Sequence, residues 1–237
     1  ASLTQLWSKP VPAVRVHFNE KAGELILFGV GIENRAITLN IKDGGLLYTV
    51  EGISPGKFIL AKDGSEFLTL MHERIYRGSE MIPIGRICAD DNPSSTGHAL
   101  SGGRYAFICP DNLIKIYKDG EYLSSTLLDL PDDFGNNANT AALSSDERYL
   151  VVGSLKGSVA LVDLQRVAVV HVSQTDLGGI EHLAMSPDGR ILAISGEREG
   201  VWLWHLESGN AMGRLPSKRV HQLRFTSNEE LIILEDQ

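Results

Sequence analysis

The 237-residue sequence predicts an all-β fold of about six units, each made of four short antiparallel strands. Throughout the chain, short runs of branched and aromatic residues alternate with turn residues, as they do between Glu181 and Gly209. The apolar residues that would end the first strands recur regularly: Phe18, Leu60, Leu100, Leu143, Met185 and Phe225. Their intervals of 40 to 43 residues are typical of propeller blades, so we predict a β-propeller.

The units follow one another along the whole chain. In order, the blades are predicted at residues 14–52, 53–90, 98–130, 140–175, 180–216 and 220–237. The last of these supplies only two strands, so three readings are open. The strand predicted in residues 1–9 closes this blade, another segment or chain completes it, or the sequence is a fragment of a longer protein. An unpaired second strand would expose backbone donors and acceptors and so invite a strand from a partner. We expect residues 1–237 to form one domain.

A family resemblance is carried by the residues from Ser186 to Gly209, which contain SPDGRILAISG and then VWLWHLESG. This stretch resembles a WD40 repeat, and Leu143 to Leu164 resembles one more distantly. The resemblance implies a propeller that acts as a platform for other proteins. Of the positions that match the Trp-Asp pair of the family, only Asp163 keeps the acid. The Gly-His dipeptide expected well before the first strand is missing, because Gly97-His98 lies too close to Leu100 to match it. We therefore expect ordinary apolar packing to hold the blades together.

Charge and composition argue against several classes of protein. The formal net charge is −8, so no general field attracts nucleic acid or an anionic membrane surface. No apolar run is long enough to span a bilayer. Two cysteines, Cys88 and Cys109, are too few for a disulfide scaffold, and no signal peptide is recognisable. We therefore expect free thiols in a reducing compartment and a cytoplasmic protein.

Strand direction sorts the loops of a propeller onto two edges. The first-to-second and third-to-fourth turns share one edge, where Asp43, Asp63, Asp119 and Asp188 serve as turn formers beside glycines. The second-to-third loops and the blade-to-blade loops share the other edge and collect charged residues. Charged loop tips are often only solvated, but on a rigid scaffold they also suit a protein partner. The predicted binding residues are Arg35, Arg74, Asn112, Asp132, Asp133, Lys156, Arg198 and Arg219.

Patterns of catalytic residues are scarce. The seven histidines show no metal-ligand spacing, and the sequence has neither a Gly-x-Ser-x-Gly elbow nor a Walker loop, so we expect no metal and no cofactor. The first hypothesis is a non-catalytic scaffold or sensor module for protein–protein interaction, within a larger protein or complex. The alternative is a propeller enzyme of the lactonase, lyase or hydrolase type with a channel active site, near which His182 and His221 would lie. Trp202 and Trp204 share one strand face, so both are expected in the core between blades.

Overall fold

The computed structural model describes residues 15–19, 23–30, 35–51, 58–61, 67–69, 74–77, 80–83, 87–88, 96–118, 121–131, 134 and 137–236. The regular structure in these ranges is β-strand, and the ranges contain no α-helix. Accordingly, they hold no helix that is long and apolar enough to cross a membrane. The all-β class predicted from the sequence is confirmed.

The strands pair in chain order, in antiparallel sets of four. The first two sets are β1 (Arg15–Asn19), β2 (Glu24–Val30), β3 (Arg35–Asn40) and β4 (Leu46–Val50), then β5 (Phe58–Leu60), β6 (Phe67–Thr69), β7 (Arg74–Arg77) and β8 (Glu80–Pro83). The third set is β9 (Thr96–Leu100), β10 (Arg104–Ile108), β11 (Leu113–Lys118) and β12 (Glu121–Leu127). The fourth set is β13 (Ala138–Leu143), β14 (Tyr149–Ser154), β15 (Ser158–Asp163) and β16 (Ala168–Gln174). The fifth set is β17 (Ile180–Met185), β18 (Ile191–Gly196), β19 (Val201–His205) and β20 (Asn210–Leu215), and β21 (Val220–Phe225) and β22 (Leu231–Glu235) form a two-stranded sheet.

These sets lie within or close to the residue ranges predicted for the blades. Each begins and ends inside its predicted range, or at most two residues before it. Within the described ranges, five sheets have four strands, and the last sheet has the two strands expected of it. The four-stranded unit read from the sequence is therefore confirmed, whereas the closed ring and the number of blades stay predictions.

The chain divides into two compact units. Unit 1 comprises residues 1–87, 99–103 and 119–121, and unit 2 comprises residues 88–98, 104–118 and 122–237. The β1–β4 and β5–β8 sheets belong to unit 1, and the last three sheets belong to unit 2. Most of the β9–β12 sheet also belongs to unit 2. The single domain expected over residues 1–237 stays a prediction.

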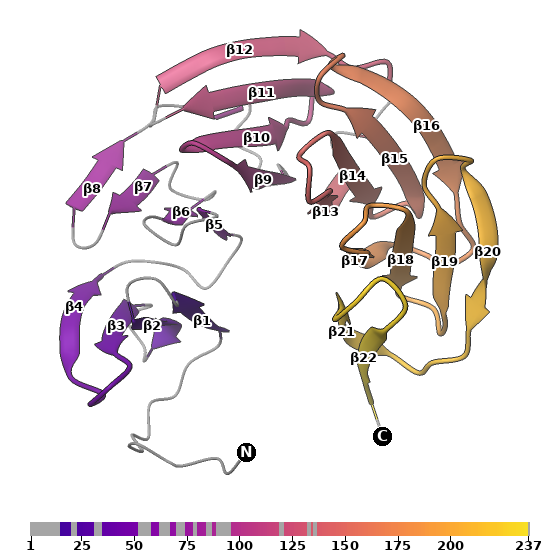
Figure 1. Cartoon of the computed structure of the whole chain (residues 1–237). Helices are drawn as coiled ribbons and strands as arrows, with labels where there is room; N and C mark the ends of the chain where they lie inside the picture. Colours follow the sequence, from indigo (N-terminus) through magenta and orange to yellow (C-terminus); the bar gives the residue numbers. More distant parts are fainter. Residues whose placement is uncertain are drawn as a thin grey trace. The chain divides into compact units, whose positions relative to one another are not determined.

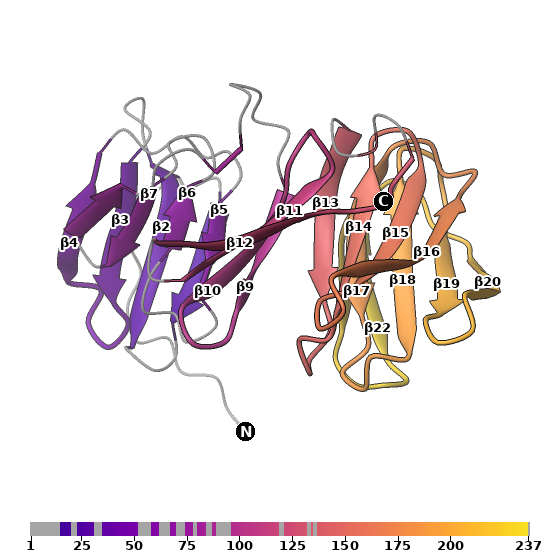
Figure 2. The same ribbon diagram turned by 90° about the horizontal axis from the view of Figure 1, so that it is seen from above.

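In unit 2, the last three sheets follow one another with their first strands side by side (Figure 1). Strand β13 contacts β17, and β17 contacts β21, while β16 and β20 lie at the far edges of their sheets (Figure 2). Burial follows this order, because the second strands β14 and β18 are buried almost throughout and the fourth strand β20 is exposed along its length. Unit 2 is therefore propeller-like.

The core of unit 2 lies between consecutive sheets. One apolar cluster joins Ile108 of β10 to Leu150 of β14, and so packs the third sheet against the fourth. The next cluster packs Leu161 against Trp204, which is buried, and Trp202 lies against the same cluster with its ring centroid 6.3 Å from that of Trp204. The prediction that both tryptophans lie in the core between sheets is confirmed, as is the apolar packing expected there.

Side-chain hydrogen bonds build the turns between first and second strands. Ser186 donates its hydroxyl proton to Asp188 Oδ1 (2.7 Å) and accepts the backbone N–H of Ile191 (2.9 Å). Asp188 Oδ1 also accepts the backbone N–H of Arg190 (3.1 Å). Gly189 takes the left-handed conformation that this tight turn needs, with φ of 71°. The turn-forming role predicted for Asp188 is confirmed.

The turn from Ser144 to Tyr149 repeats this arrangement. Ser144 donates to Asp146 Oδ1 (2.6 Å) and accepts the backbone N–H of Tyr149 (2.8 Å). Glu147 occupies the position of Gly189 and has φ of 60°, which costs a non-glycine residue about 1–2 kcal/mol. We call residues 144–149, 164–167, 186–191, 206–209 and 226–230 the turn edge of unit 2.

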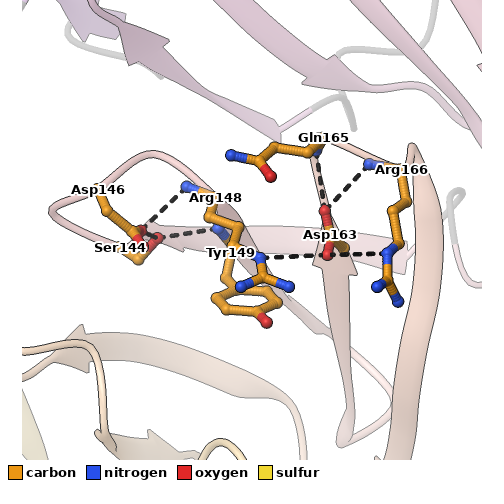
Figure 3. A network of polar contacts seen from close by, with 7 residues as sticks. All are labelled: Ser144, Asp146, Arg148, Tyr149, Asp163, Gln165 and Arg166. Atoms are coloured by element: carbon orange, nitrogen blue, oxygen red, sulfur yellow. Dashed lines mark hydrogen bonds and ion pairs between the residues drawn. The ribbon is translucent and has the colours of Figure 1, made fainter.

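A polar network surrounds Asp163, the acid that ends β15 (Figure 3). The carboxylate is buried, and its Oδ1 accepts the backbone N–H groups of Gln165 (2.9 Å) and Arg166 (3.0 Å). Arg148 donates its Nε–H to Oδ2 (3.4 Å), and its guanidinium lies 4.8 Å from the ring centroid of Tyr149. Apolar packing is thus supplemented by a polar network at this position, which the expectation of apolar packing alone did not include.

The state of the cysteines differs from the expectation. Cys88 and Cys109 form a disulfide, their Cα atoms are 5.5 Å apart, and both residues are buried. The prediction of free thiols is therefore wrong. Sequence spacing does not indicate such a pair, because only the path of the chain brings Cys88 beside the end of β10. The cytoplasmic location, which rested partly on free thiols, stays a prediction.

Candidate functional site

The second-to-third loops and the loops between sheets meet along one edge of unit 2, opposite the turn edge. We call this the loop edge, and it comprises residues 109–112, 128–131, 134, 137, 155–157, 175–179, 197–200 and 216–219. Backbone hydrogen bonds connect each loop to the next one. Leu155 N–H donates to Asn137 O (2.7 Å), Thr175 N–H to Gly157 O (2.9 Å), Glu197 N–H to Gly179 O (3.0 Å), and Gly200 N–H to Ser217 O (3.0 Å). The shared edge predicted for these loops is confirmed within unit 2.

Glycines allow the loops to approach so closely. A Cβ atom on Gly196 would lie 2.6 Å from Gly179 O and 2.7 Å from Leu177 O. A Cβ atom on Gly157 would likewise lie 2.7 Å from Gly178 O. Since these neighbours are backbone atoms, they cannot move aside without disturbing a loop. The loop edge is therefore held by main-chain contacts that only glycine permits at these positions.

Two arginines converge on the loop between β16 and β17. Arg198 donates an Nη1 proton to Asp176 O (3.0 Å), and Arg214 pairs with the carboxylate of Asp176 (3.2 Å). Arg214 also donates an Nη2 proton to Glu199 O, above Gly200, where a side chain would collide with the guanidinium. The Arg214–Asp176 pair is about half exposed, so it contributes little to stability and mainly orients the two side chains.

An open depression lies beside this arginine. It measures about 350 Å³ and is lined by Glu199, Gly200, Arg214, Pro216 and Ser217. Glu199 and Arg214 contribute a negative and a positive charge to its wall, and exposed Lys218 and Arg219 follow directly in the chain. The depression therefore offers charged groups of both signs to a polar side chain of a partner.

The structure places four of the eight predicted binding residues on the loop edge of unit 2. Lys156, Arg198 and Arg219 are exposed on the loop edge, and Asn112 lies half-buried there in the β10–β11 turn. Arg35 and Arg74 begin β3 and β7 in unit 1. Asp132 and Asp133 lie outside the described residues. Binding itself stays a prediction for all eight residues.

Sequence reasoning missed Asp176 on this edge and Arg214 beside it. Asp176 was not singled out because a lone acid before two glycines looks like a turn residue. Arg214 lies on β20 beside the edge, and it is not among the predicted binding residues. The signal that could have found it is Gly200, because a glycine without a Cβ leaves room for the guanidinium of Arg214 from the neighbouring strand.

The pKa values of several titratable groups are shifted at the turn edge and on the first strands. Burial raises the pKa of Asp163, but hydrogen bonds from the Arg166 and Gln165 N–H groups and from Arg148 outweigh it and hold the pKa below its ordinary value. The hydrogen bond from Ser186 lowers the pKa of Asp188. Burial lowers the pKa of His182, which therefore favours the neutral imidazole.

His182 and His221 lie on the first strands of their sheets, β17 and β21. His221 Nε2 lies 2.6 Å from Asp236 Oδ1, and this hydrogen bond lowers the pKa of the carboxyl group. In the described part of the chain, no three His, Cys, Asp or Glu side chains gather in a way that could hold a metal ion.

Comparison with known proteins adds a distant likeness. Sheets of four antiparallel strands whose first strands pack side by side make this a propeller-like all-β protein. No protein-family model matches the chain. A stretch of 56 residues, 24% of the chain, is 29% identical to NACHT and WD repeat domain-containing protein 2 of Homo sapiens, and it covers 3% of that protein. The chain is thus compatible with the WD-repeat class and spans only a small part of the length of this relative.

Proposed function

We propose that this chain is a non-catalytic module for protein–protein interaction, built on a WD40-like propeller and belonging to a larger protein or complex. The observation that carries the proposal is the loop edge of unit 2. There, exposed charged side chains stand on loops whose backbones are hydrogen-bonded to one another. Such loops lose little conformational entropy when a partner docks, because they are ordered beforehand.

The chemistry of the edge favours a polar protein surface as the partner. Both signs of charge are exposed on it or beside it: Lys156, Asp176, Glu197, Arg198, Glu199, Arg214, Lys218 and Arg219. Mixed charge steers a complementary protein and selects its orientation rather than attracting any polyanion. Leu155 is 52% exposed beside Lys156, and it offers an apolar contact within this polar surround.

The experiment is an affinity pull-down with charge reversals on opposite edges. One variant carries Lys156→Glu and Arg219→Glu on the loop edge. The matched control carries Arg166→Glu and Arg190→Glu on the turn edge, whose side chains are 77% and 74% exposed. Both variants change the net charge by the same amount, so a general electrostatic effect cancels between them.

We expect the loop-edge variant to lose bound proteins that the wild type and the control retain. Circular dichroism and the melting temperature confirm that both variants are folded. If the two variants capture the same proteins, the loop edge is not the docking surface. Turnover in a hydrolase screen of the wild-type chain, with stoichiometric metal, would instead favour a propeller enzyme.

The edge of β22 is part of the same proposal. By register, Leu231–Leu234 of β22 correspond to Leu192–Ser195 of β18. Leu192, Ala193 and Ile194 are buried, whereas Ile232 and Leu234 are each 55% exposed. Because β22 is apolar on both faces, as a central strand is, we propose that a strand from another segment or chain covers it. Replacing Ile232 and Leu234 by lysine should remove that partner from the pull-down and leave loop-edge partners bound.

A further inference from the structure

The disulfide of unit 2 is attached to the loop edge. Cys109 directly follows β10 and forms the corner of the β10–β11 turn. Its N–H donates to Leu113 O (2.9 Å), and its carbonyl accepts the N–H of Asn112 (3.0 Å). The bond to Cys88 therefore attaches a distant position of the chain to the turn at the loop edge of this sheet.

Asn112 passes this constraint to the next segment. Its backbone is in the left-handed region, with φ of 60°, which a non-glycine residue adopts only when its surroundings hold it there. Asn112 O accepts the N–H of Leu128 (3.0 Å), and its Nδ2 donates to Pro131 O (3.4 Å). A continuous path thus leads from the disulfide through the turn to the residues after β12.

The buried setting makes the bond responsive only when the turn opens. Cys88 is 4% exposed and Cys109 is fully buried, so a reductant cannot reach either sulfur in the closed turn. Thiol–disulfide exchange needs a thiolate in contact with one sulfur of the bond. Reduction and opening of the turn are therefore coupled.

We propose that the Cys88–Cys109 disulfide is a redox clasp that holds the β10–β11 turn and residues 128–131 in place on the loop edge. A dithiol reductant supplies a thiolate that attacks one sulfur and forms a mixed disulfide, and the other cysteine leaves as a thiolate. The second thiolate of the reductant then displaces the remaining cysteine. Two electrons and two protons pass to the protein as two thiols, and the reductant becomes a disulfide. The disulfide keeps the β10–β11 turn and residues 128–131 ordered, and this effect does not require a bound partner.

The experiment measures hydrogen exchange of backbone amides in oxidised protein, in dithiothreitol-reduced wild type and in the Cys88→Ala/Cys109→Ala variant. Alkylation and intact mass count the thiols in each sample. We expect no alkylated thiol in the oxidised protein and two after reduction. We also expect exchange at least tenfold faster in peptides 109–113 and 126–131 once the bond is lost. Peptide 191–200, in the equivalent part of the β17–β20 sheet, serves as the internal control and should not change.

Each alternative result contradicts the clasp in a distinct way. Two reactive thiols in protein purified without reductant would show that the bond does not form. Unchanged exchange in fully reduced protein would show that hydrogen bonds alone hold the turn. Faster exchange throughout unit 2, in reduced wild type as well as in the variant, would make the disulfide a general support of the fold. These readouts do not involve a partner, so their outcome is independent of the pull-down.

Discussion

The two edges of unit 2 are held together by different means. At the turn edge, side chains bond to polar groups two to five residues away, as Ser186 does with the carboxylate of Asp188 and the backbone N–H of Ile191. At the loop edge, backbone groups bond across separations of about twenty residues, as Leu155 does with Asn137. The turn edge thus combines local motifs with bonds between turns, such as Ser145 Oγ–H to Pro187 O (2.6 Å), whereas the loop edge is joined mainly by main-chain bonds between neighbouring loops.

This difference explains what each edge can do. A local motif keeps its geometry in every sheet where its few residues recur, so the turn edge is regular and tolerates sequence change elsewhere. The hydrogen bonds that join neighbouring loops of the loop edge use main-chain groups, so they do not depend on which side chains the loops carry. Its surface can therefore vary in chemistry without a change in its backbone, which suits a docking surface.

The largest expected effect comes from crowding the loop edge. Gly196→Ala should lower the free energy of unfolding by about 2–3 kcal/mol, since the new Cβ overlaps two backbone carbonyls and the region cannot relax easily. Urea unfolding followed by tryptophan fluorescence measures the loss. A cost below about 0.5 kcal/mol would mean that the loops slide apart easily, and the contrast between the edges would be weaker than described.

Neutralising the buried carboxylate of Asp163 at the turn edge should lower stability by nearly as much. Asp163→Asn is expected to cost about 2 kcal/mol near neutral pH, because the acceptor of Gln165 and Arg166 loses its charge beside Arg148. The folded pKa of Asp163 is lowered, so its stabilisation is complete above the unfolded pKa and is lost as pH falls through the folded pKa.

The pH dependence provides a separate check of the same residue. Urea midpoints of the wild type should fall more steeply than those of Asp163→Asn between about pH 5 and pH 2. Parallel curves for the two proteins would show that the carboxylate is no better stabilised in the folded than in the unfolded chain.

Removing one local hydroxyl should have a smaller effect. Ser186→Ala should cost about 1 kcal/mol, because Ile191 N–H loses its acceptor and Asp188 loses a donor. Ser144→Ala in the equivalent turn is the matched variant, and a similar loss is expected from thermal and urea unfolding. Clearly unequal losses would show that the two turns are not the same motif energetically.

The smallest expected effect is a gain in stability. Glu147→Gly relieves a left-handed conformation that Gly189 adopts without strain in the next sheet. The greater freedom of glycine in the unfolded chain offsets part of this, so we expect stabilisation of about 0.5–1 kcal/mol. A shift in the melting temperature measures this gain, which is not available at the equivalent position of the next sheet because Gly189 already occupies it. A loss instead would indicate that the Arg104–Glu147 pair matters more than the strain.

Prediction from sequence succeeded where structure is local. The repeat interval and the alternating strands around Ser186 and Trp204 gave the four-stranded units and the buried tryptophans. Lys156, Arg198 and Arg219 were assigned to one edge because strand direction alone decides the edge on which a loop lies. Asp176 and the disulfide were missed, since each depends on a partner that lies far away in the chain.

The sequence by itself determined the all-β class, the blade-like unit and the edge on which each loop of unit 2 lies. Those properties follow from hydrophobic periodicity and turn chemistry, which act over a few residues. Only the tertiary structure decided which backbone groups join the loops, which glycines must stay small and that Cys88 meets Cys109. The physical reason is that these contacts arise from packing one sheet against the next, and no local pattern encodes the distance between them.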